Sequence, residues 1–139
     1  MKDIPSFLDF QPSRLASVSY PIEVAWNYAD SSIESHLISP RGIYKWTDWS
    51  FKSQDLHGIT KEELIVHGKP PSWICRQMNE CFSGKVVYTE DPDYDGMWLS
   101  ELFSVYFVEK PKFEFGNIND LLENILSPNF ADRTQDWQK

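Results

Sequence analysis

The chain has 139 residues, which fits one domain, and its 41% hydrophobic and 15% aromatic residues support a packed core and exclude a disordered chain. The formal net charge of -8 argues against sequence-independent binding along long nucleic acids, because such binding requires Lys and Arg to neutralise phosphates. No stretch approaches the roughly 20 apolar residues of a membrane span, the first residues lack a signal-peptide pattern, and Cys75 and Cys81 do not suit a disulfide, so we expect a cytoplasmic protein without membrane contact.

The first part of the chain has the pattern of three strands. Residues 4–10 are a short apolar run, and residues 21–30 alternate apolar and polar side chains with the period of two that marks a half-buried strand. Residues 32–38 continue as a third strand after a turn at residues 30–32. Because the second and third strands are joined by such a short turn, we expect the three strands to form an antiparallel meander.

Helices dominate the rest of the pattern. Residues 40–54 read as an aromatic loop, and Thr60 with Glu63 three positions later predicts a capping box at the start of a helix. Residues 71–82 place apolar side chains at helical spacing, and Gly84 follows as a stop signal. The remaining predicted elements are a buried strand, a helix and a last helix, at residues 85–89, 95–107 and 118–125.

This order of elements predicts an α/β fold. We expect a mixed sheet in which three antiparallel N-terminal strands are joined by one or more parallel strands, with helices on its faces. Repeats and linker-like segments are missing from the sequence. One domain over residues 1–139 is therefore predicted, with a polar tail at residues 127–139.

Two acidic positions are candidates for chemistry. Asp9 ends the first predicted strand, and Gln11 shares its face, because side chains at i and i+2 of a strand point the same way. Two carboxylates in that arrangement are a common way to hold a divalent metal, but the second position here carries an amide. Asp95 opens a helix after the predicted strand at residues 85–89, and ligand sites of open α/β sheets gather at such strand ends. Both acids also have structural interpretations, Asp9 as a turn residue and Asp95 as a helix cap.

Aromatic and histidine side chains leave two interpretations open as well. His57 precedes Gly58 and is either a base that titrates near neutral pH or a loop residue bonded to the backbone. Trp46 and Trp49 are either platforms on which bases stack or a hydrophobic cluster beneath the loop.

Four segments together resemble the DEDD superfamily of 3'–5' exonucleases, the group of ribonuclease T and the proofreading subunit of bacterial DNA polymerase III. In chain order they are LDFQ at residues 8–11, YPIEVAW at 20–26, HGIT at 57–60 and DGMWL at 95–99. The resemblance covers about residues 6–107 and rests on the joint order and spacing of the segments. It implies a ribonuclease H-like fold.

The resemblance also implies an activity. Its members hydrolyse phosphodiester bonds at single-stranded RNA or DNA 3' ends with two metal ions, Mg²⁺ or Mn²⁺. It assigns catalytic roles to Asp9, Gln11 and Asp95, metal ligation to Asp9 and Asp95, and substrate contacts to His57, Ile59, Trp46 and Trp49.

The match departs from the family at two points. Gln11 stands where the family has Glu, and the late His-x4-Asp segment on a final helix is missing, since no His follows His67. Asp132 and Asp136 are the candidates for a fourth acid, and we expect the final helix to be lacking. Activity therefore stays open between an exonuclease and a catalytically impaired or truncated module that binds. An unrelated acidic interaction domain is a third hypothesis, and a homodimer is considered because a missing helix would leave apolar surface to cover.

Overall fold

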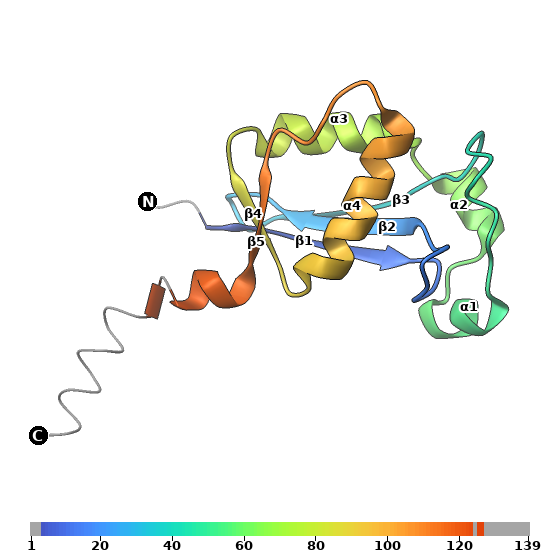
Figure 1. The fold of residues 1–139 in the computed structure, drawn as a ribbon, viewed down its shortest axis with the longest axis horizontal. Coiled ribbons are helices and arrows are strands. Elements are labelled where there is room, and N and C mark those ends of the chain that lie inside the picture. The colour runs from blue at the N-terminus through green and yellow to red at the C-terminus, as the bar shows by residue number, and fades with distance from the viewer. Residues whose placement is uncertain (1–3, 124, 127–139) are drawn as a thin grey trace, which may run out of the picture.

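The computed structural model describes residues 4–123 and 125–126 (Figure 1). The predicted polar tail at residues 127–139, with Asp132 and Asp136, lies outside the described residues. The named elements are β1 (Ser6–Pro12), β2 (Pro21–Asn27), β3 (Ile33–Leu37), α1 (Phe51–His57), α2 (Lys61–His67), α3 (Pro71–Phe82), β4 (Val86–Thr89), α4 (Pro92–Tyr106) and β5 (Glu114–Asn117). Helical backbone continues at residues 118–123 and 125–126.

The strands form one five-stranded sheet with the order β3-β2-β1-β4-β5. β1 pairs antiparallel with β2, and β2 pairs antiparallel with β3, while β4 runs parallel to both β1 and β5. The predicted mixed sheet, with its N-terminal meander, its parallel strands and its flanking helices, is confirmed. The pairing of β1 with β4 is short, because it covers only Ser6 with Val87 and Phe7 with Tyr88.

The core lies on one face of this sheet, which we call the core face. Leu8 and Phe10 of β1 point into it and are buried, because alternate side chains of a strand face opposite sides. Figure 1 shows α3 and α4 together on this side of the sheet. Their buried residues, such as Met78 and Leu102, close the core. Each fully buried side chain of this size contributes about 1.5–3 kcal/mol to folding.

The opposite side, the outer face, carries the other half of the β1 pattern. Phe7, Asp9 and Gln11 point to this side, and they are half-buried or exposed. The helical segment at residues 118–123 begins at the β5 end of the outer face, where Ile118 lines a pocket with Phe7. Chemistry on β1 therefore has to take place on a face that α3 and α4 leave accessible.

Three predicted boundaries were wrong for identifiable reasons. The loop predicted at residues 40–54 ends earlier, because Ser50 caps α1 by accepting a hydrogen bond from the backbone of Ser53, and Gly58 ends that helix with φ 74°. None of the residues of α1 is buried, so it has no apolar period to detect. α4 begins at Pro92 rather than Asp95, since Pro suits the first turn of a helix. β1 continues to Pro12, which puts Asp9 inside the strand rather than at its end.

Candidate active site

Asp9 projects from β1 onto the outer face and is exposed. It lies opposite Ala25 of β2, and it comes two residues after Phe7, where the parallel pairing with β4 stops. The carboxyl ends of parallel strands are where open α/β sheets bind ligands. Asp9 therefore meets this rule through the β1–β4 pair, although the antiparallel pairing with β2 continues past it.

Asp95 reaches the same junction from the first turn of α4. Its side chain is buried, and the residue is only 4% exposed. Oδ1 accepts a hydrogen bond from the backbone N–H of Phe10 at 3.4 Å, and Oδ2 accepts one from the hydroxyl of Thr89. Asp95 thus ties α4 to β1 and to β4. The helix cap is Asp91, whose carboxylate accepts from the backbone N–H of Tyr94 at 3.3 Å.

The electrostatics of the junction disfavour negative charge. The pKa of Asp95 is raised to about 6, chiefly by burial and also by the charges of Asp9 and Asp91, although the hydrogen bonds from Thr89 and Phe10 act to lower it. The charge of Asp9 therefore acts on Asp95, while their joint role at a metal site stays a prediction. Their accessibility differs. Asp9 is exposed on the outer face, whereas both oxygens of Asp95 accept hydrogen bonds from the protein.

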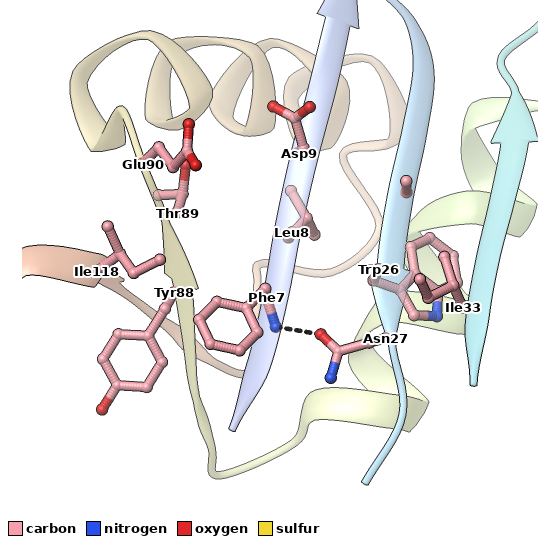
Figure 2. Close-up of a pocket in the computed structure, with 11 residues that line it drawn as sticks. Phe7, Leu8, Asp9, Trp26, Asn27, Ile33, Tyr88, Thr89, Glu90 and Ile118 are labelled. Atoms are coloured by element: carbon pink, nitrogen blue, oxygen red, sulfur yellow. Dashed lines mark hydrogen bonds between the residues drawn. The ribbon is translucent and has the colours of Figure 1, made fainter. Parts of the chain in front are cut away.

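Glu90 is a third carboxylate at this place, and it was missed from the sequence. It directly follows β4, is exposed, and lines the same pocket of about 460 Å³ as Asp9. Figure 2 shows the Asp9 and Glu90 carboxylates at one end of that pocket, and Phe7, Tyr88 and Ile118 further along it. Desolvation raises the pKa of Asp9, and the charge of Glu90 adds to the rise. The sequence signal that could have identified Glu90 is its position immediately after the predicted strand that pairs with β1.

Gln11 shares the face of Asp9 but serves a different hollow. Gln11 lines a second pocket, of about 420 Å³, together with Ser50 and His57. Its Nε2 donates a long hydrogen bond, of 3.4 Å, to the carbonyl oxygen of Pro12. Gln11 therefore lines a different pocket from Asp9 and Glu90, although it lies only two residues after Asp9 on β1.

His57 ends α1 and belongs to the turn between α1 and α2. Its Nδ1 accepts a hydrogen bond from the backbone N–H of Ile59 at 3.0 Å, so in the neutral ring the proton lies on Nε2. That Nε2 atom is buried and has no hydrogen-bond partner among the described residues, while the ring packs edge-on against Trp49 at 5.9 Å. Ile59 is half-buried and packs against the core. Their proposed contacts with a substrate stay predictions.

The two tryptophans of the aromatic loop are placed differently. Trp46 is 3% exposed and stacks on Tyr20 with ring centroids 5.2 Å apart, while its Nε1 donates to Glu101 at 2.8 Å. Trp49 is half-buried and donates from Nε1 to the side-chain oxygen of Gln54 at 2.9 Å. Trp46 is therefore buried, with one ring face against Tyr20, whereas Trp49 keeps part of its side chain exposed.

The carboxylates of the junction have the chemistry of ligands for a hard divalent cation. The ion pairs found among the described residues involve other acids, so Asp9, Glu90 and Asp95 have no basic ion-pair partner there. No three Asp, Glu, His or Cys side chains in the described part of the chain are grouped as a ready-made metal cage. Mg²⁺ is usually held by one or two carboxylates together with waters and phosphate oxygens, so the donor set fits one such ion.

Comparison with known proteins bears on the fold. No protein-family model matches the sequence, and no curated protein matches it. Among solved structures, the zinc-bound E. coli exonuclease I complex with single-stranded DNA matches with a TM-score of 0.68 and 14% identity, over 89% of this chain and 30% of that one. The chain has an exonuclease-type, ribonuclease H-like fold.

Two further structures agree with this assignment. Exonuclease I from Methylocaldum szegediense matches with a TM-score of 0.67 and 13% identity, over 88% of this chain and 30% of that one. A product-bound exonuclease I matches with a TM-score of 0.66 and 13% identity, over 92% and 33%. The chain spans about a third of the length of these proteins.

No helix within the described residues is long and apolar enough to cross a membrane.

Proposed function

We propose that the chain is an exonuclease-like domain that hydrolyses phosphodiester bonds at the 3' end of single-stranded nucleic acid. One observation carries the proposal: Asp95 of α4 accepts a hydrogen bond from the N–H of Phe10, the residue after Asp9, and the charge of Asp9 acts on it. Support comes from the fold, which is shared with exonuclease I structures described as a complex with single-stranded DNA and as a product-bound form. Single-stranded DNA is therefore the first substrate to test, with RNA as the second.

The residues of the junction have distinct roles in this proposal. Asp9 presents its carboxylate on the outer face, where the 3' end of a nucleic acid has access. Asp95 holds α4 against β1 and β4 through Phe10 and Thr89 and so fixes the geometry of the junction. Asp9 would hold a Mg²⁺ or Mn²⁺ ion, which would supply an activated water and charge stabilisation at the leaving oxygen. A second ion would require further oxygen ligands, such as those of the phosphate group.

A second candidate function is a module that holds a strand end without cutting it. It is favoured by Gln11, which replaces a carboxylate and faces the second pocket, and by Asp95, whose two oxygens are both engaged by the protein. General acid–base help is typically worth about 10²–10⁴-fold, so loss of a base would reduce turnover more than binding.

A labelled oligonucleotide separates the two candidates. The protein is incubated with a 5'-labelled single-stranded DNA and Mg²⁺ or Mn²⁺, beside Asp9→Ala, Gln11→Glu and the control Asp93→Ala, an exposed acid of the same junction region. We expect stepwise 3' shortening that Asp9→Ala abolishes, Gln11→Glu increases and Asp93→Ala leaves unchanged. Activity of Gln11→Glu alone would identify a binding module. Absence of shortening in every folded variant would refute the nuclease proposal.

A further inference from the structure

We propose that the free edge of β3 pairs antiparallel with the same strand of a second copy of the chain, with Ser35 on the two-fold axis. Such a contact would join two five-stranded sheets into one continuous sheet. This pairing is independent of the proposed function, because it involves the backbone and side chains of β3 and none of the residues at the β1, β4 and α4 junction.

The backbone of β3 directs hydrogen-bonding groups away from the sheet. β3 is the last strand of the order β3-β2-β1-β4-β5, so β2 pairs with one of its two sides. Just outside its ends, Ser32 accepts a hydrogen bond from the N–H of Tyr28 at 2.8 Å, and Ile38 donates one to the carbonyl oxygen of Ile22 at 2.8 Å. Residues of antiparallel strands alternate between hydrogen-bonded and non-hydrogen-bonded pairs. The even-numbered residues therefore turn their N–H and C=O groups toward β2, and the odd-numbered residues of β3 turn theirs to the free edge.

The free edge is accessible over most of its length. Ser35 at its centre is exposed, and Ile33 is 77% exposed. At the other end, the carbonyl oxygen of Leu37 already accepts a hydrogen bond from the N–H of Lys69 at 2.8 Å. Natural proteins protect such edges with Lys, Pro or a bulge. The sequence Ile-Glu-Ser-His-Leu and the unbroken register of β3 provide none of these, so the edge is suited to pairing with another strand.

The side chains of β3 are complementary to those of a second, antiparallel copy. With Ser35 opposite Ser35, Ile33 lies opposite Leu37 on the outer face, and Glu34 lies opposite His36 on the core face. An inward-pointing charge such as Glu34 deters strand pairing in general, but a second copy places an imidazole that can donate a hydrogen bond directly opposite it. Moving the axis to Glu34 would oppose two carboxylates, which is destabilising. The charges therefore favour a second copy in this one register.

The pairing would also extend the outer face. A two-fold axis between antiparallel edge strands is perpendicular to the sheet, so both copies present the outer face on the same side. Ile33 lines the pocket that contains Asp9 and Glu90. Leu37 of the second copy would lie beside Ile33 and lengthen the apolar wall of that pocket.

Sedimentation of the full chain over a wide concentration range tests for this dimer. It is measured for the wild type, Ile33→Lys, Ser35→Pro and the control Leu15→Lys, because Leu15 is also 77% exposed but lies outside β3. We expect a wild-type dimer whose dissociation constant rises about tenfold or more in Ile33→Lys and Ser35→Pro and less than about twofold in Leu15→Lys. Pro at position 35 removes an N–H that faces the free edge, so the monomer should stay folded, which circular dichroism verifies.

A cysteine on the axis tests the register. In a hydrogen-bonded antiparallel pair the two Cα atoms lie about 5.5 Å apart, a distance that suits a disulfide. Ser35→Cys should therefore form a disulfide-linked dimer on mild oxidation. Ile33→Cys should not, because the two copies of residue 33 would lie about 13 Å apart along the strands. The wild type, with its free Cys75 and Cys81, gives the background.

Two results would overturn the proposal. A wild type that stays monomeric at every concentration would refute it and leave the edge to a strand of another protein. A dimer that neither Ile33→Lys nor Ser35→Pro weakens, and that Ser35→Cys does not cross-link, would place the contact elsewhere and refute it as well. Neither result bears on the nuclease proposal, which the oligonucleotide assay tests separately.

Discussion

Replacing Asp95 by Asn should make the protein more stable at alkaline pH, although it removes the Asp95 carboxyl from the proposed active site. Asp95 is buried, and its pKa is raised from 3.8 to about 6, chiefly by burial. The folded state therefore holds this proton at pH values where the unfolded chain has released it. Stability contributed by the protonated group is present below pH 3.8 and is lost as the pH rises through about 6. Asn carries no charge and avoids this loss.

The size of the effect follows from the same pKa. The interval between 3.8 and about 6 corresponds to about 3 kcal/mol at about 1.36 kcal/mol per pH unit. Asn keeps an acceptor for the N–H of Phe10, but it forms weaker hydrogen bonds than a carboxylate and adds a donor. These changes offset about 1 kcal/mol or more, which leaves a net gain of about 1–2 kcal/mol at alkaline pH.

Urea unfolding of the wild type and Asp95→Asn, monitored by Trp fluorescence, measures this effect. The difference in free energy of unfolding between the two proteins should change by about 2 kcal/mol between about pH 4.5 and pH 8, in favour of Asn at the higher pH. Asp93→Asn, an exposed control, should show almost no such change. A difference that is constant across this pH range would refute the view that Asp95 is a desolvated carboxyl.

Three further substitutions test single contacts, one at the junction and two elsewhere in the fold. Thr89→Val removes the hydroxyl that donates to Asp95. In urea unfolding we expect a loss of about 1.5–3 kcal/mol near pH 8 and little loss near pH 4. An equal loss at both pH values would indicate a steric effect instead. Gly68→Ala would place a Cβ 2.2 Å from a backbone oxygen and should lower the free energy of unfolding by about 2 kcal/mol or more. Arg14→Ala breaks a 2.7 Å pair with Asp48 that is partly exposed, so its cost should stay below about 1 kcal/mol, and a larger loss would show that the pair organises the loop.

The strands could be predicted because burial on one face leaves a period of two in the sequence. β2 alternates through Ile22, Val24 and Trp26, all buried, and the capping box of Thr60 and Glu63 forms as predicted. These signals are local, and local chemistry suffices to produce them. α1 leaves no such pattern, because it buries none of its residues and its caps alone define it.

The site was predictable only in part because its chemistry depends on register. Asp9 and Asp95 could be linked through sequence segments, and the structure brings them to one junction. The engagement of Asp95 by Thr89 and Phe10 depends on how α4 packs against two strands, which the sequence does not report. Glu90 is a single acid after a strand, and only the folded structure shows that it lines the same pocket as Asp9.

The position of a bound metal ion tests the central claim most directly. Crystals of the full chain soaked in Mn²⁺ would be measured at a wavelength where manganese scatters anomalously. We predict an anomalous peak at the Asp9 carboxylate on the outer face, with oxygen ligands at about 2.0–2.3 Å. The absence of a peak at Asp9 in crystals that bind Mn²⁺ elsewhere would contradict the assignment of this junction as a metal-dependent nuclease site.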